Sequence, residues 1–174
     1  LLIVPIGVVG ASNAVNMLAG FNGLEAGLGF VTLMFMGVFG YINGELAAAA
    51  IAFVMAAAIL AFIAYNWYPA RILPGDSFVY ALGSTIAVIA IIGNMEKFAL
   101  YIFTPWIIEF VLKLRSGLAA ENYGTLGKNG VLKPKYNTPY SLTHLVMMSG
   151  DFKEWQVSAI LIGMQVMVCV VALL

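Results

Sequence analysis

The chain has 174 residues, of which 63% are hydrophobic and 9% charged, and its mean hydropathy is +1.00. Soluble domains carry about 25% charged residues, so this composition excludes an ordinary soluble protein and indicates an integral membrane protein. The formal net charge is zero, which gives no electrostatic reason to expect a nucleic acid as partner. A single cysteine, Cys169, lies in an apolar run, and we expect it to be a small packing residue.

Six apolar runs are long enough, or nearly so, to cross a bilayer as helices, which need about 20 residues. They cover residues 1–18, 28–42, 45–65, 77–92, 98–114 and 156–174. These runs predict an all-α fold, a polytopic transmembrane helix bundle of about six membrane helices that forms one membrane domain over residues 1–174. The chain starts inside an apolar run without Met or the features of a signal peptide, so we expect it to be a piece of a longer protein.

Successive spans alternate direction, so the connections at 13–27, 66–76 and 115–154 are expected on one membrane face. The positive-inside rule makes that face cytoplasmic, because it holds all but one of the basic residues. It carries Arg71, Lys113, Arg115, Lys128, Lys133, Lys135 and Lys153, and the other face carries Lys97. We therefore expect residues 115–154 to form a cytoplasmic polar loop beside a site that opens to the cytoplasm. Alanine-rich residues 47–58 are expected to allow close helix packing.

The first polar motif is "NAVNMLAGFNGLEAG", residues 13–27. Asn13 and Asn16 are three residues apart, so a helix places them on one face, where their amide oxygens could ligate a cation or meet a phosphate. Helix capping or interhelical hydrogen bonding explains the same pair equally well. Glycines in this motif permit a tight turn and the close approach of a ligand to the backbone. For Glu25, a place in the first turn of the next helix is as good an explanation as any functional role.

The second motif is "NWYPARILPGDSF", residues 66–78, in which Asp76 stands where a helix should begin. A plain N-cap would explain an acid at this position. Alternatively, Asp76 and Asn16 together would supply oxygen ligands for Mg²⁺, with substrate phosphates and water completing the octahedron. One carboxylate with few other protein ligands is a pattern of phosphoryl-transfer sites.

The third feature is the run of cations that begins at Lys113. A solvated run of charge that sets membrane orientation explains most of these lysines. Lys113 and Arg115 end a helix and are the best candidates to reach a diphosphate, although Glu109, one turn earlier, could simply pair with Lys113. His144 has no second ligand nearby in sequence, which gives little support for a metal or general-base role.

The first two motifs together resemble the polyprenyl-phosphate N-acetylhexosamine-1-phosphate transferase family. The similarity is closest to its UDP-GlcNAc:dolichyl-phosphate branch, which carries N-A-[IV]-N-x-L-A-G-x-N-G-L-E-A-G and N-W-Y-P-[SA]-R-x-x-x-G-D. Relatives that use a MurNAc-pentapeptide carry Asp-Gly pairs where this chain has Ala19-Gly20 and Asn22-Gly23. The resemblance covers essentially the whole chain, as the C-terminal portion of an enzyme of roughly ten helices.

The resemblance implies a role for each matching residue. Asn16 and Asp76 would be the catalytic pair and would bind Mg²⁺, with Mn²⁺ as a second option, and Asn22 would contact the uracil of UDP-GlcNAc. Leu73 falls where the family can place an aromatic over the base, and Arg115 is our candidate for the amino sugar on charge and location. The lipid phosphate of a dolichyl-type polyprenol would meet Ser12, Asn13, Ala14, Val15, Asn16 and Met17. An acidic pair and a lysine that the family carries in its N-terminal half are not present in this chain.

The resemblance predicts transfer of GlcNAc-1-phosphate from UDP-GlcNAc to a membrane polyprenyl phosphate, with release of UMP. The expected partners are these two substrates and membrane lipid, and a homodimer is left open. A non-catalytic membrane module or a transporter segment with a polar cytoplasmic vestibule is the alternative. Charges inside the spans would favour a transporter, and these spans carry almost none.

Overall fold

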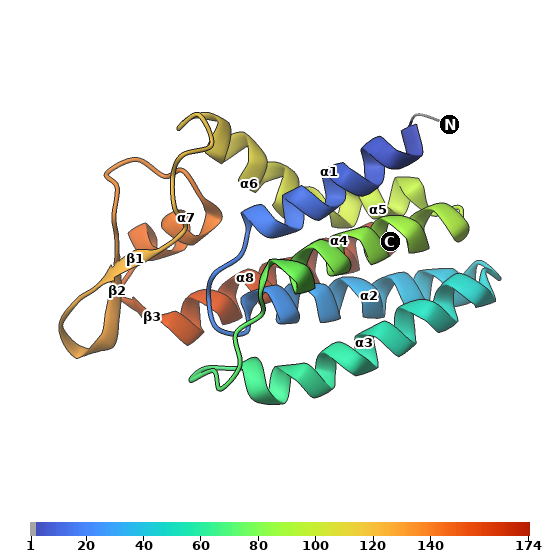
Figure 1. Cartoon of the computed structure of the whole chain (residues 1–174), viewed down its shortest axis with the longest axis horizontal. Helices are drawn as coiled ribbons and strands as arrows, with labels where there is room; N and C mark the ends of the chain where they lie inside the picture. The colour runs from blue at the N-terminus through green and yellow to red at the C-terminus, as the bar shows by residue number, and fades with distance from the viewer. Residues whose placement is uncertain (1–2) are drawn as a thin grey trace.

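The computed structural model describes residues 3–174, and most of them are helical (Figure 1). The helices are α1 (Ile3–Met17), α2 (Leu24–Ile42), α3 (Leu46–Asn66), α4 (Asp76–Ile92), α5 (Glu96–Ile102), α6 (Thr104–Leu114), α7 (Leu142–Ser149) and α8 (Glu154–Leu173). Short strands are β1 (Gly124–Leu126), β2 (Val131–Pro134) and β3 (Phe152–Lys153), with one 3₁₀ turn, η1 (Lys128–Gly130). The structure thereby confirms the helical, membrane-type fold that the composition predicts.

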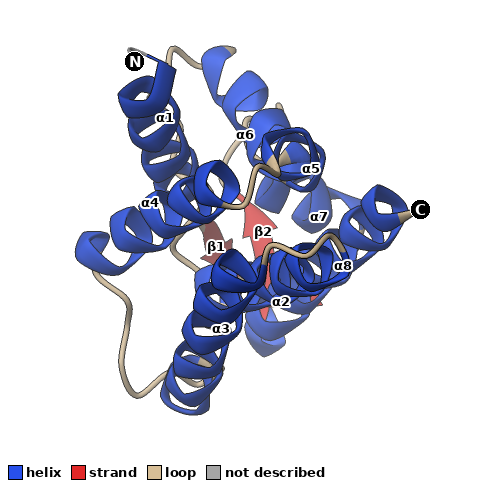
Figure 2. Cartoon of the chain, turned by 90° about the vertical axis from the view of Figure 1, so that its right-hand side faces the viewer, coloured by secondary structure: helices blue, strands red, loops and turns tan. Residues whose placement is uncertain are grey.

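Seen along the bundle, α1, α4, α5 and α6 form one group and α2, α3 and α8 form another (Figure 2). Small residues allow α3 to pack closely on α2. Ala48, Ala52, Ala56 and Ile59 recur every three or four positions and are all buried, whereas the opposite face of α3 is exposed. This confirms close packing for one face of the alanine-rich segment.

Within residues 3–174, three helices are long and apolar enough to cross a membrane, namely α2, α3 and α8, and α4 is apolar but shorter. The six predicted spans are therefore only partly recovered by length. Residues 98–114 do not form the one helix that their hydropathy predicts, because α5 ends at Ile102 and α6 begins at Thr104. Pro105 lies in the first turn of α6, where its missing N–H costs nothing, but it could not continue α5.

Buried polar groups join α8 to its neighbours inside the bundle. Gln165 Nε2 donates to Thr32 Oγ1 of α2 at 3.0 Å and to the Ile102 carbonyl oxygen of α5 at 2.9 Å. It also lies 3.3 Å from the sulfur of Cys169, which is fully buried, as expected of a packing residue. These contacts fix the position of α8 relative to α2 and α5.

The polar segment 115–154 is more ordered than the predicted loop. Its strands form an antiparallel sheet in the order β1-β2-β3, in which Thr125 pairs with Lys133 and Leu132 with Phe152. The helix α7 packs beside this sheet, and Ser141 caps it by accepting a hydrogen bond from the Thr143 N–H. Strands of two to four residues are too short to give a readable alternation in the sequence.

Candidate active site at one end of the bundle

Residues 13–27, 66–76 and 115–154 meet at one end of the bundle, as the alternation of the spans predicts (Figure 1). Asn122 links the polar segment to the end of α1, since its Nδ2 donates to the carbonyl oxygens of Met17 and Ala19, each at 2.7 Å. A helix end leaves such carbonyls without partners. Asn122 therefore serves as a C-terminal cap supplied by a distant part of the chain.

The turn between α1 and α2 packs against two aromatic side chains. A Cβ added at Gly20 would lie 2.7 Å from Tyr123 Oη, and one added at Gly23 would lie 2.6 Å from Cε3 of Trp67. Both glycines have positive φ, 115° and 75°. The turn thus requires glycine for its conformation and also for space.

A line of polar contacts runs between α1 and α4, which are antiparallel. The hydroxyls of Ser12 and Ser84 lie 2.8 Å apart, and one turn further along α1 Asn16 Nδ2 donates to Tyr80 Oη at 3.2 Å. The helices approach closely because Gly83 faces the α1 backbone, where an added Cβ would lie 2.6 Å from the Ala11 carbonyl oxygen. This contact fixes the register of α1 against α4.

Asp76 is the first residue of α4 and lies one turn before Tyr80 on the same face. The N-cap is Gly75, without a side-chain capping bond, so the interpretation of Asp76 as a plain N-cap is wrong. The carboxylate is exposed and accepts no hydrogen bond from the described residues. Asp76 therefore keeps its oxygens open to a ligand, beside a helix N-terminus that favours negative charge.

Asn16 and Asp76 offer oxygen atoms of a kind that would suit a divalent cation. Asn16 uses its amide nitrogen on Tyr80, and the part of the chain that the structure describes offers no partner to its amide oxygen. With Asp76 it gives two hard oxygen donors of the kind that Mg²⁺ binds. Among residues 3–174, no three His, Cys, Asp or Glu side chains are grouped to hold a metal. Asn16 and Asp76 would thus hold a cation only in part, and other oxygen ligands would have to come from outside the described residues.

An apolar groove of about 640 Å³ runs between α1, α4, α5 and α6. Asn13, Ala14 and Met17 line it close to the end of α1, and Trp106, Ile107 and Phe110 line it from α6. The lining is otherwise apolar or aromatic, and Asn13 and Glu96 contribute an amide and a carboxylate to it. A groove of this composition suits a hydrocarbon chain whose head group lies at the Asn13 end.

The run predicted to face the lipid phosphate, residues 12–17, presents several faces. Asn13, Ala14 and Met17 line the groove, whereas Ser12 and Asn16 turn toward α4. Val15 is 2% exposed and belongs to the core. Successive helical side chains point about 100° apart, so one ligand cannot meet all six.

The three residues predicted to bind the nucleotide sugar lie in separate segments. Asn22 is half-buried in the α1–α2 turn, and its side-chain amide forms no hydrogen bond within the described chain. Leu73 is 70% exposed on the loop before α4. Arg115 is exposed where α6 ends. No hydrogen bond between described residues joins these three side chains.

Three lysines near this end are paired with acidic side chains. Lys113 lies 3.9 Å from Glu109, which confirms that pairing, and Glu109 also accepts from the Ser141 hydroxyl and the Leu142 N–H. The exposed pairs are Lys133 with Asp151 and Lys135 with Glu121, the latter at 2.7 Å. Arg115, which was predicted to reach a diphosphate, forms no ion pair with described residues, and neither does Arg71, so both are open to an anionic ligand.

His144 and Glu25 serve the packing of this end. His144 is fully buried in α7, its Nδ1 accepts from the Tyr140 N–H at 3.3 Å, and burial lowers the pKa of its imidazole. Glu25 is 4% exposed in the first turn of α2, which agrees with the structural one of its two explanations, and it accepts from the Gly20 N–H. Both side chains thus have structural partners.

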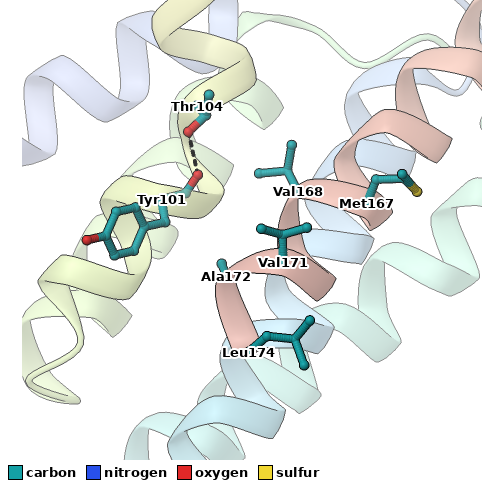
Figure 3. Close-up of a pocket in the computed structure, with 7 residues that line it drawn as sticks. All are labelled: Tyr101, Thr104, Met167, Val168, Val171, Ala172 and Leu174. Carbon is teal, nitrogen blue, oxygen red and sulfur yellow. Dashed lines mark hydrogen bonds between the residues drawn. The ribbon is translucent and has the colours of Figure 1, made fainter.

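A second cavity, of about 590 Å³, lies between α5, α6 and α8 (Figure 3). Its lining is mostly apolar and includes Tyr101, Met167 and Leu174, and the Thr104 hydroxyl donates to the Tyr101 carbonyl oxygen at 2.6 Å. The α8 helix has 20 residues and is about 30 Å long, and the cavity lies at its C-terminal end. It is therefore remote from the polar end of the bundle.

The fold and site define a membrane helix bundle with polar side chains at one end and an apolar groove beside them. The model described as Glycosyl transferase family 4 matches residues 1–94, more than half of the chain, and the chain belongs to this family. This confirms the membership that the two motifs indicate.

Relatives of two kinds are similar to the chain. Proteins of Saccharolobus solfataricus and Sulfolobus acidocaldarius, provisionally named UDP-N-acetylglucosamine–dolichyl-phosphate N-acetylglucosaminephosphotransferases, are 36% and 33% identical over 100% and 99% of the chain. The chain covers 54% and 53% of their lengths, so it spans about half of the curated relatives that it matches. A phospho-N-acetylmuramoyl-pentapeptide-transferase of Clostridium perfringens is 34% identical over 58% of the chain, which covers 32% of that protein.

Proposed function

We propose that this chain is part of an enzyme that transfers GlcNAc-1-phosphate from UDP-GlcNAc to a dolichyl-type polyprenyl phosphate and releases UMP. The observation that carries the proposal is the antiparallel packing of α1 and α4, which brings Asn16, Tyr80 and Asp76 to one end. The groove beside them and the names of the two archaeal relatives support the same reaction. The product is a lipid-linked sugar diphosphate that can start glycan assembly.

The groove explains how a long lipid would meet a polar substrate. Its apolar lining holds the hydrocarbon chain, while Asn13 and Met17 leave the lipid phosphate at the polar end. The Asn13 amide nitrogen donates to the Val9 carbonyl oxygen at 2.8 Å, so its amide oxygen is held in a fixed direction. By the positive-inside rule, this end faces the cytoplasm.

Asn16 and Asp76 would hold Mg²⁺, or Mn²⁺ in its place, which when bound neutralises charge on the phosphates. In the reaction, a lipid phosphate oxygen forms a bond to the β-phosphorus of UDP-GlcNAc. The bond from that phosphorus to the bridging oxygen breaks, and UMP leaves with this oxygen. A phosphate monoester has its second pKa near 6 and is already ionised at neutral pH, so no strong base is needed.

The contribution of this chain is to orient the reacting groups. Tyr80 holds the Asn16 amide, and the Ser12–Ser84 contact holds the helices in register. Asn22 presents a free amide, a donor and an acceptor together, to the uracil ring. Arg71 and Arg115 remain available to the diphosphate. Positioning of this kind is the main source of rate in phosphoryl transfer.

The test is Asp76→Asn in the full-length protein, with Asp151→Asn as control. Asp151 is an exposed acid at the same end whose partner is Lys133. We expect Asp76→Asn to lower metal-dependent UMP release by about 100-fold or more, as loss of a charge-stabilising group does elsewhere. The control should behave as wild type. Near-normal turnover of Asp76→Asn in a radiolabelled-lipid assay would remove Asp76 from the metal site.

Ligand binding separates the enzyme from a non-catalytic module. UDP-GlcNAc with Mg²⁺ should raise the melting temperature. At a ligand concentration of a hundredfold Kd, the free energy of unfolding should increase by about 2.7 kcal/mol. UDP-glucose, or UDP-GlcNAc without metal, should stabilise less. If none of the three changes the melting temperature, the transporter or module becomes the better explanation.

A further inference from the structure

The peptide group of Asn22 is held by a helix far along the sequence. The Asn22 N–H donates to Glu154 Oε1 at 2.9 Å, and the Ser158 hydroxyl donates to the Asn22 carbonyl oxygen at 3.0 Å. Glu154 and Ser158 are four residues apart in the first two turns of α8, so they share one face. Side chains of α8 thus form hydrogen bonds with both the N–H and the carbonyl oxygen of Asn22.

The hydrogen bonds to Asn22 are part of a longer contact between α8 and the α1–α2 turn together with α2. One turn beyond Ser158, Ile162 lies over Gly27, where an added Cβ would overlap the Ile162 side chain. Further along, Gln165 donates to Thr32. A shift of α8 along α2 would have to break these contacts together, so α8 is a rigid support for the turn.

The side chain of Asn22 contrasts with its backbone. Within the described chain its amide forms no hydrogen bond, and the residue is only half-buried. The Gly20 N–H of the same turn is bound to Glu25, and Gly23, with φ 75°, is the N-cap of α2. The turn is therefore immobilised at its backbone while one polar side chain is left free to meet a ligand.

We propose that Glu154 and Ser158 are positioning residues for nucleotide recognition, which fix the Asn22 peptide so that its amide meets the pyrimidine of the nucleotide sugar. This inference rests on the proposed function, because it takes a uridine nucleotide as the ligand of Asn22. It assigns a task to α8, which lies outside the residues that the family model matches. Glu154 and Ser158 act through Asn22 and need not touch the nucleotide.

The experiment measures UDP-GlcNAc affinity and steady-state kinetics of the full-length protein in nanodiscs. Glu154→Ala should raise Kd and KM for UDP-GlcNAc roughly 10- to 100-fold, since misplacement of a binding group by about 1 Å has such effects. The KM for the lipid phosphate and the melting temperature without ligand should change little. Glu154→Gln keeps an acceptor oxygen at the same reach and should restore affinity to within about threefold of wild type. Glu121→Gln, an exposed acid at the same end, is the matched control.

A double-mutant cycle shows whether Glu154 works through Asn22. If it does, Glu154→Ala combined with Asn22→Ala should bind UDP-GlcNAc no more weakly than Asn22→Ala alone. Additive losses would overturn the positioning role. Where Glu154→Ala does not fold, Ser158→Ala and Ser158→Thr decide, because threonine keeps the hydroxyl that alanine removes; equal affinities in these two would overturn the proposal.

The outcomes distinguish this inference from the proposed function. Wild-type protein that binds no UDP-GlcNAc would overturn both. Wild-type protein that binds it, with weaker binding by Asn22→Ala and unchanged binding by Glu154→Ala, would overturn the positioning role alone.

Discussion

Replacement of Gly83 by alanine tests whether the contact between α1 and α4 builds the site. The added methyl would lie 2.6 Å from the Ala11 carbonyl oxygen and from the Ser12 Cα, both of which are backbone atoms. Ordinary contact begins at 3.4 Å, so the helices must separate by about 0.8 Å, the difference between the two values. Side-chain rotation cannot relieve this overlap, because no side-chain atom is among its nearest neighbours.

The cost of that separation follows from the distances. A shift of about 0.8 Å would take the Ser12–Ser84 contact from 2.8 Å to about 3.6 Å, beyond hydrogen-bond range. Overpacking of this kind costs about 1–3 kcal/mol and a lost hydrogen bond about 1 kcal/mol. Because the same shift moves Asn16 away from Tyr80, we expect kcat/KM for UMP release to fall about 100-fold.

The assay compares UMP release and thermal unfolding of Gly83→Ala with those of Gly163→Ala. Gly163 lies inside α8 with no atom within 4 Å of an added Cβ, so alanine there should stabilise the helix by about 0.5–1 kcal/mol without loss of activity. If Gly83→Ala unfolds at the wild-type temperature and its kcat/KM stays within about threefold of wild type, the α1–α4 contact does not position the site.

Two further substitutions probe the polar segment. Asn122→Asp keeps the size of the side chain but cannot donate to the Met17 and Ala19 carbonyl oxygens, so we expect a loss of about 1–3 kcal/mol in the free energy of unfolding and reduced UMP release; an unchanged unfolding curve would contradict the capping role. Burial lowers the pKa of His144 in the folded protein, so its contribution to stability should be complete above pH 6.5, the unfolded value, and be lost as the pH falls through the folded pKa. His144→Gln should remove the dependence of the melting temperature on pH in that range. A pH profile that matches the wild type would show that another group titrates there.

The sequence determined the features that depend on local composition. Apolar runs gave α2, α3, α4 and α8 to within a few residues, because burial in lipid requires a continuous apolar helix. Because successive spans alternate in direction, the sequence also predicted that the motifs of Asn16 and Asp76 lie at the same end of the helix bundle, as the structure confirms. The predicted start of α2 is four residues late, since Glu25 and Gly27 lower the hydropathy of its first turn.

Pairing between residues that are distant in sequence depends on the tertiary structure. The break between α5 and α6, the sheet within residues 115–154, and the packing of Gly83 on α1 depend on neighbours that hydropathy does not reveal. Glu154 reaches Asn22 across 132 residues of sequence. An apolar run specifies that a helix enters the membrane, but its neighbours depend on the fit of small and polar side chains, which is a property of two helices together.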